Sequence, residues 1–203
     1  MSRFDRVEIP YGAYWSTPFA KWQGSLQHLH SLKLAAHVTK LELQKRGIAP
    51  ETFDFGVLGT TITQYQSFYG AVWPFYEIGM RNVAGPTVSQ ACASGARVLL
   101  TAAAEIQLGM ATTALALGAD RLSNGPHIYY PSSSGLAAPA RARNKPSSTS
   151  RRMPWAATRC YKQRRMLLPG TAYRRESNTT WCYIVTSNTR LLAAISMHSR
   201  SAM

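Results

Sequence analysis

Hydrophobic and polar positions follow alternating strand-like and helix-like periods over the first two thirds of the chain. Short apolar runs typical of buried strands occur at 54–62 and 112–120, a strand that enters a turn is expected at 86–91, and 6–10 is a short strand candidate. Helical periods cover 25–46, 71–80 and 94–110. Buried strands separated by helices predict an α/β fold whose sheet, largely parallel, is covered on both faces.

The first of these helical periods carries the clearest face. Leu34, Val38 and Leu41 recur at spacings of four and three residues, so we expect them to lie together on the buried side. Gly47 follows and is expected to end the helix, since glycine readily adopts the left-handed conformation that helix ends require.

This order is lost after about residue 132, where serine, proline and arginine dominate and only 181–185 resembles a strand. Residues 1–135 carry 10 Lys or Arg and 8 Asp or Glu, whereas 136–203 carry 13 Lys or Arg and one acid, Glu176. The net charge of +14 therefore arises almost wholly in the last third. We expect a domain at 1–133 followed by a basic tail of low order at 134–203.

Other bulk features narrow the class of protein. A chain of 203 residues suffices for one domain with a tail. The sequence has no apolar run of about 18 residues, the length that would predict a membrane-spanning helix. Its first residues lack the apolar core of a signal peptide. Cys92, Cys160 and Cys182 show no C-x-x-C spacing, so they predict neither disulfides nor a metal site, and we expect a cytoplasmic location.

Cys92 gives the strongest chemical signal. It stands between an expected strand and an expected helix, where free backbone N–H groups and the helix dipole favour a thiolate. Its neighbours are alanine, serine and glycine, which allow a substrate to approach the sulfur. The helix at 94–110 is apolar on nearly all sides, which predicts that it is buried. A buried cysteine without a chemical role is the alternative interpretation.

The segment SQACASGARVLLTAAAEIQLGMATTALALGADRLSNGPH resembles the nucleophile region of the thiolase family. That pattern is a cysteine followed by a small residue, Ser and Gly, then an Ala-rich helix ending in Gly, a strand and a loop. RVEIPYG, QGSL and FDFGVLGTTI match earlier parts of the family in order, so the resemblance covers about residues 5–131. It implies the N-terminal half of a two-fold fold: a mixed five-stranded sheet with helices on both faces and the cysteine helix at the centre.

The resemblance implies a transferase of lipid metabolism, an acetyl-CoA C-acyltransferase that acts on coenzyme A thioesters and uses no separate cofactor. Cys92 would hold the acyl group covalently. The family's second cysteine and its histidines lie in Gly-His-Pro and Cys-x-Gly-Gly-Gly motifs, which this sequence lacks. The resemblance therefore implies a truncated, inactive form of an enzyme that is a homo-oligomer when intact. His127 lies in a loop comparable to one near the nucleophile, and a loop histidine without a role is the alternative.

Three departures from the family pattern leave the acyl substrate open. Ser89 and Gln90 precede Cys92 where the family often has Asn and a basic residue. Glu8-Ile9-Pro10 replaces an opening Arg-Thr-Pro, and 14–22 resembles an insertion.

Codon degeneracy offers an explanation for the tail. When the codons are read from their third bases, 136–141 permits Gly-Gly-Thr-Gly, 160–167 permits Leu-Gln-Thr-Ala-Glu and 180–184 contains Val-Leu. All three resemble family sequence expected downstream, so we predict a frameshift near 132–135 and an out-of-frame tail. The alternative is a non-enzymatic binding protein whose basic tail engages nucleic acid or an anionic surface. The arginines form no helical face and no regular pattern with aromatic residues, which disfavours it.

Overall fold

A computed structural model describes residues 4–21, 23–121 and 176–187. The strands are β1 (Tyr14–Ser16), β2 (Ala20–Lys21), β3 (Phe55–Gly59), β4 (Thr87–Val88), β5 (Thr113–Arg121) and β6 (Glu176–Thr186). The helices are α1 (Ser31–Lys45), α2 (Val72–Ile78) and α3 (Ser94–Gln107), with a short 3-10 helix, η1, at Pro50–Thr52. The helices and strands expected between 25 and 121 are thus confirmed, with shifts at their ends.

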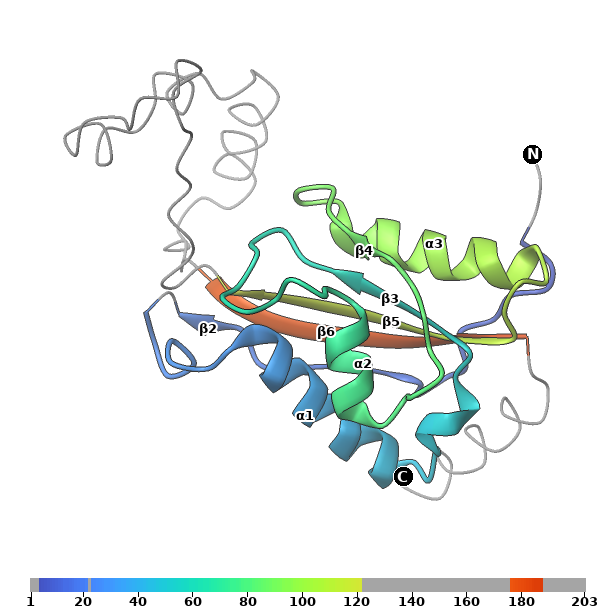
Figure 1. The fold of residues 1–203 in the computed structure, drawn as a ribbon, viewed down its shortest axis with the longest axis horizontal. Coiled ribbons are helices and arrows are strands. Elements are labelled where there is room, and N and C mark those ends of the chain that lie inside the picture. Colours follow the sequence, from blue (N-terminus) through green and yellow to red (C-terminus); the bar gives the residue numbers. More distant parts are fainter. Residues whose placement is uncertain (1–3, 22, 122–175, 188–203) are drawn as a thin grey trace, which may run out of the picture. The chain divides into compact units, whose positions relative to one another are not determined.

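The strands form one mixed sheet, which confirms the predicted α/β architecture (Figure 1). Five strands follow one another in the order β1-β6-β5-β3-β4, and β2 pairs with β6 beside that path. β3, β4 and β5 are parallel, whereas β6 is antiparallel to β5, β1 and β2. Helices α1 and α2 cover one face of the sheet and α3 covers the other (Figure 1).

β6 comes from the segment that the sequence predicts to be a tail. The strand expected at 181–185 is confirmed, and β6 pairs with β5 from Thr186 opposite Thr113 to Asn178 opposite Arg121. The other residues of 134–203 lie outside the described ranges, except Ser187, which follows β6. The boundary at 133 and the low order of the tail therefore stay predictions.

The N-terminal strands differ from expectation. The run at 6–10 contributes a single bridge, between Glu8 and Thr186, rather than a strand. Instead β1 and β2 lie within 14–22, the segment that resembled an insertion. The reason is the presence of β6, which offers these residues an antiparallel partner: Tyr14 pairs with Tyr183, and their rings stack 6.1 Å apart.

α1 buries a face other than the expected one. Leu41 is 51% exposed, and Leu34 and Val38 are only partly buried. The buried positions combine small and apolar residues, which let the helix approach the sheet closely: Ser31, Leu32, Ala35, Ala36, Thr39 and Leu43. The expected helix end is confirmed, since Gly47 has a φ of 65° and its N–H donates to the carbonyl of Gln44.

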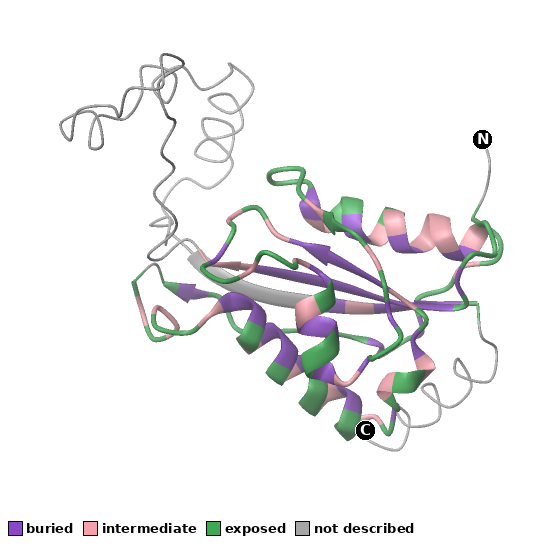
Figure 2. Cartoon of the chain, in the orientation of Figure 1, coloured by how far each residue is buried: buried purple, intermediate pink, exposed green. Residues whose placement is uncertain are grey.

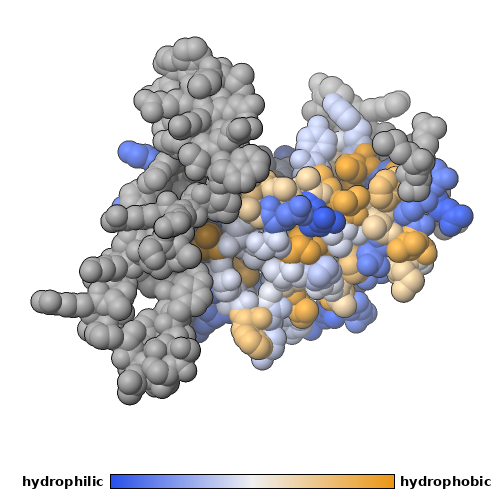
Figure 3. All heavy atoms as spheres, turned by 90° about the horizontal axis from the view of Figure 1, so that it is seen from above, coloured by the Kyte–Doolittle hydropathy of each residue, from blue (hydrophilic) through white to orange (hydrophobic). Residues whose placement is uncertain are grey.

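α3 is an outer layer in the described part of the chain, not a central helix buried on all sides. Its buried residues lie four positions apart on one face, which packs on the sheet (Figure 2): Ser94, Val98, Ala102 and Ile106. Leu100 is 45% exposed, and Leu108 and Met110, just beyond the helix, are 75% exposed. Figure 3 views the molecule from this side and shows hydrophobic side chains at the surface among hydrophilic ones. In the described residues the helix is therefore buried on its sheet-facing side and exposed on the other.

Cys182 lies in the core between β6 and α1, where it is fully buried. Burial raises the pKa of its thiol well above the usual value of 9.0. In the unfolded chain the thiol ionises at that usual value, so above it the unfolded state releases a proton that the folded state retains. The free energy of unfolding should then fall as the pH rises, by up to about 1.4 kcal/mol per pH unit from this group.

Urea denaturation of the wild-type chain and of Cys182→Ala between pH 8 and 10.5 measures this effect. We expect the variant to lose stability less steeply with rising pH, even if it is less stable at pH 8. Cys92→Ala controls for the loss of an exposed thiol. Parallel curves for wild type and Cys182→Ala would contradict the prediction.

Candidate active site

Cys92 is exposed, on the short connection 89–93 between β4 and α3. The parallel strands β3 and β4 both end at this edge of the sheet, and the N–H of Thr60 donates to the carbonyl of Val88 across it. Ligands of parallel α/β sheets bind outside the carboxyl ends of the strands. The predicted strand–cysteine–helix unit is confirmed. Its cysteine is exposed to solvent, not buried.

The turn that presents Cys92 is held by hydrogen bonds around Ser94. The Ser94 hydroxyl accepts from the N–H of Gln90 at 2.8 Å and donates to the carbonyl of Ala91 at 2.8 Å. The N–H of Ala93 donates to the carbonyl of Gln90 at 2.9 Å. Ala91 has a φ of 46°, a left-handed conformation that alanine adopts only under such constraint. The surrounding bonds thus fix the backbone on which the thiol stands.

The first turn of α3 points its backbone amides toward this connection. Ala93 caps the helix, and its side chain makes no capping hydrogen bond. The positive end of the helix dipole is therefore not neutralised by a capping oxygen, and negative charge on a nearby group is favoured. Arg97, one turn into α3, donates through Nε to the side chain of Gln90 at 2.7 Å and adds a positive charge to this region.

Gly59 sets how closely α3 approaches the sheet. A Cβ at this position would lie 2.6 Å from a methyl carbon of Val98 and 3.8 Å from the carbonyl oxygen of Ser94. The start of α3 therefore sits directly on the end of β3 only because the residue there has no side chain. This close contact holds the helix, and with it the Cys92 turn, at a fixed distance from the strand ends.

Asp120 binds the neighbouring loop at the same edge. Its carboxylate accepts four hydrogen bonds, from the N–H and hydroxyl of Thr61 at 2.8 and 2.7 Å, from the Thr60 hydroxyl at 3.1 Å and from the N–H of Ile62 at 3.0 Å. Sequence reasoning missed both Asp120 and Ser94. The signal for Asp120 was an acid at the end of an otherwise apolar strand, beside a run of threonines.

The His30 side chain has a structural role at the start of α1. His30 caps α1: its Nδ1 accepts from the N–H of Leu32, while its Nε2 donates to the carbonyl of Tyr65 at 2.7 Å. His127 and Cys160 lie outside the described ranges. Cys182 is buried in the core, so it does not join Cys92 at the surface. No cluster of metal-ligating side chains occurs in the part of the chain that the structure describes.

The sequence and the fold of this chain were compared with those of known proteins. The model for the thiolase N-terminal domain matches residues 13–163. An acetyl-CoA acetyltransferase of Paracoccus denitrificans is 31% identical over 115 residues, which cover 56% of this chain and 29% of the relative. One of Cupriavidus necator is 28% identical over 121 residues, covering 59% of this chain and 31% of the relative. The matched region is thus less than a third of each relative's length.

Solved structures agree with the sequence matches. The acetyl-CoA acetyltransferase of Bacillus anthracis superposes with a TM-score of 0.58 at 25% identity, covering 66% of this chain and 34% of that one. Human mitochondrial 3-ketoacyl-CoA thiolase shares the fold, with a TM-score of 0.67 at 15% identity, over 95% of this chain and 67% of that one. None of the described helices is long and apolar enough to cross a membrane. An exposed cysteine ahead of an Ala-rich helix, on a thiolase-like sheet and within a matched thiolase domain, leads to one conclusion: the chain belongs to the thiolase family.

Proposed function

We propose that this chain is the N-terminal part of a thiolase-type acyl-CoA C-acyltransferase of lipid metabolism, in which Cys92 accepts the acyl group. The observation that supports the proposal most is the exposed position of Cys92 on a constrained turn at the start of α3. The names of the similar proteins, acetyl-CoA acetyltransferases and a 3-ketoacyl-CoA thiolase, indicate the class of substrate. The three cysteines of this chain show no disulfide or metal-site spacing, which favours the reducing cytoplasm as the place where the protein acts.

The proposed chemistry begins with the thiolate of Cys92. Its Sγ attacks the 3-keto carbon of a 3-ketoacyl-CoA, and the bond between C2 and C3 breaks. The acyl group stays on Sγ as a thioester, and the electron pair leaves with C2, which takes up a proton to give acetyl-CoA. The thiol of a second coenzyme A then loses its proton and attacks the acyl-cysteine, which releases the shortened acyl-CoA and the Cys92 thiolate.

Only part of this chemistry is available in the sequence. The proton transfers and the stabilisation of the oxyanion require further groups. The Gly-His-Pro and Cys-x-Gly-Gly-Gly motifs that carry them in the family are absent from the 203 residues. We therefore propose that the chain by itself holds the nucleophile without the complete catalytic unit.

Alkylation kinetics test the role of Cys92. At pH 7 we expect iodoacetamide to modify Cys92 in the folded chain, while the buried Cys182 stays unmodified until the protein is unfolded. Peptide mass spectrometry over a time course reports the rate at each cysteine. Modification of Cys182 at the rate of Cys92 in the native state would contradict both the burial of β6 and the proposal.

Exposure to solvent alone would also make Cys92 reactive. An equally placed thiol away from the helix start is therefore needed as a control. Leu108 lies at the other end of α3, where the dipole is negative, and is 75% exposed. In a Cys92→Ala background, Leu108→Cys places an exposed thiol at that end. If the helix start favours the thiolate, Cys92 should react about threefold to fivefold faster at pH 7 than the thiol at 108. Equal rates would show that the turn does not activate the sulfur.

A further inference from the structure

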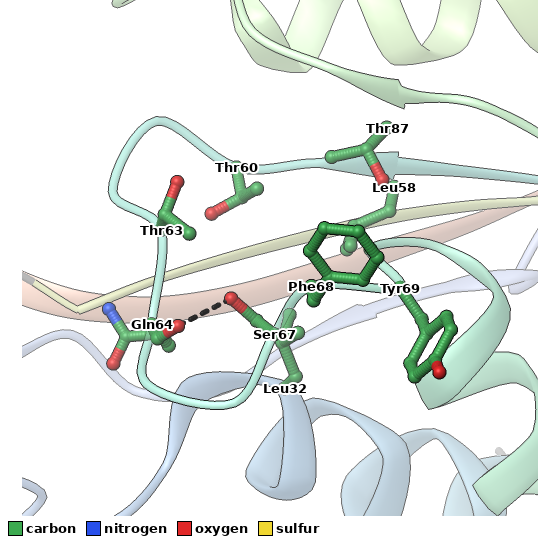
Figure 4. Close-up of a pocket in the computed structure, with 10 residues that line it drawn as sticks. Leu32, Leu58, Thr60, Thr63, Gln64, Ser67, Phe68, Tyr69 and Thr87 are labelled. Carbon is green, nitrogen blue, oxygen red and sulfur yellow. Dashed lines mark hydrogen bonds between the residues drawn. The ribbon is translucent and has the colours of Figure 1, made fainter.

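A pocket of about 350 Å³ lies between the connection from β3 to α2 and the start of α1 (Figure 4). Leu58 on β3 and Leu32 on α1 form part of its wall, and Phe68 and Tyr69 come from the connecting loop. Successive residues of a strand point to opposite faces of the sheet. Gly59 faces α3, so the neighbouring Leu58 and its pocket lie on the face opposite to α3. The pocket volume falls at the lower end of the range of ligand sites, roughly 300–1,000 Å³.

The wall of the pocket carries no charged side chain. Several of its hydroxyls are already used within the protein. The Thr60 hydroxyl bonds to Asp120, the Ser67 hydroxyl donates to the carbonyl of Gln64 at 2.5 Å, and the Thr87 hydroxyl accepts from the N–H of Ala71 at 2.8 Å. These side chains therefore offer a ligand mainly carbon atoms, so the pocket suits an apolar, uncharged group.

The loop over the pocket exposes an unusual amount of aromatic surface. Phe68 is 91% exposed although it lines the cavity, and Tyr65 on the same loop is 80% exposed. The Phe68 ring packs edge-on against that of Tyr69, with centroids 5.5 Å apart. Exposed aromatic surface beside a cavity is typical of a binding site, because a ligand there removes both from water.

The same loop is held by hydrogen bonds near its start and at its middle. Asp120 binds residues 60–62, and the carbonyl of Tyr65 accepts the hydrogen bond from His30, which caps α1. Loops held in this way keep a pocket open without a ligand and reduce the entropy lost on binding. Two independent observations thus indicate a built site: an uncharged apolar cavity and a fixed loop that carries its aromatic rim.

We propose that this pocket binds a small, uncharged apolar molecule or the apolar chain of a larger one, with Phe68 packing against the ligand and Asp120 positioning the loop. The site lies on the opposite face of the sheet from α3 and does not require Cys92, so it stands or falls separately from the proposed acyl transfer. Asp120 acts through the loop and is a positioning residue, not a contact of the ligand.

The test uses the full chain and 1-aminoanthracene, a small neutral fluorophore, with n-octanol as competitor. We expect saturable binding at one site and displacement by octanol. Phe68→Ala should weaken binding about threefold to tenfold, because a packed aromatic contact is lost. Tyr65→Ala removes another highly exposed aromatic side chain of the same loop, one that does not line the pocket, and should stay within about twofold of wild type. Cys92→Ala should bind as wild type does.

A second pair of variants tests the role of Asp120. Asp54 makes a similar set of hydrogen bonds at the opposite end of the sheet, accepting from the N–H and hydroxyl of Thr112 and from the N–H of Thr113. Asp120→Asn should weaken binding of the fluorophore, whereas Asp54→Asn should leave it unchanged at a comparable loss of stability. Equal effects of the two aspartate variants, or of Phe68→Ala and Tyr65→Ala, would overturn the proposal.

Two further outcomes would also overturn it. Displacement by coenzyme A but not by octanol would show that the site binds a charged ligand. Binding that declines as the protein concentration rises, in step with dimer formation on size exclusion, would show that a second copy of the chain fills the pocket.

Discussion

The 203-residue chain is expected to show no measurable thiolysis of acetoacetyl-CoA, at least about a thousandfold below an intact thiolase. A nucleophile acts together with its base, its acid and its oxyanion donors, so removing several of them leaves little of the rate. The matched region covers only 29% of the Paracoccus denitrificans acetyltransferase, and the motifs that carry the other groups are missing from the sequence. Cys92 alone would be acylated slowly and would not turn over.

A spectrophotometric assay of acetoacetyl-CoA loss measures this directly. The Paracoccus denitrificans enzyme at equal concentration provides the upper reference, and Cys92→Ala of the present chain provides the background. Turnover within a few fold of the intact enzyme, lost in Cys92→Ala, would show that the chain is a complete catalyst and that our view of it as one part is wrong.

Removal of β6 is expected to abolish folding. A stop after residue 174 takes away the neighbour of β5, β1 and β2, together with three buried core residues, Cys182, Ile184 and Val185. Truncating a single buried Ile to Ala costs about 2–5 kcal/mol, and whole domains are stable by only about 5–15 kcal/mol. The free energy lost with the whole strand therefore exceeds the free energy of unfolding of the domain.

The matched control is a stop after residue 187, which keeps β6. We expect circular dichroism and urea denaturation to show a cooperative transition for this form and none for the chain that ends at 174. Ile184→Asp and Ser187→Asp repeat the comparison at single positions, one fully buried and one exposed. Cooperative unfolding of the 174-residue form at the wild-type midpoint would show that β6 does not belong to the sheet.

Local pattern predicted the middle of this fold well because the signals there are strong. The run at 112–120 and the glycine at 47 lie where the structure has β5 and the end of α1. The same reasoning failed for α1's buried face, because alanine and threonine pack closely against the sheet while the larger Leu41 stays outside. A search for hydrophobic periodicity relies mainly on large apolar residues. It does not detect a helix face on which small residues pack closely.

Long-range pairing was the other limit of the sequence. β1 and β2 were missed because such short strands exist only through β6, more than 150 residues later in the chain. At the active site, the family resemblance identified Cys92, but not the supports of its turn. Ser94 and Asp120 act through hydrogen bonds to backbone groups. These contacts depend on the tertiary structure, so the spacing of residues in the sequence does not predict them.

The position of β6 also has a consequence for how the chain folds during synthesis. Thr113 and Thr186, which face each other in the sheet and share a hydrogen bond, are 73 residues apart. Such non-local pairing has a high contact order and forms slowly, because a long loop must close before any bond between the strands is made. While the ribosome makes residues 122–175, β5 has β3 on one side and a row of unpaired backbone groups on the other. A strand edge of that kind is an aggregation hazard, so the nascent chain has a window of vulnerability that closes only when β6 emerges.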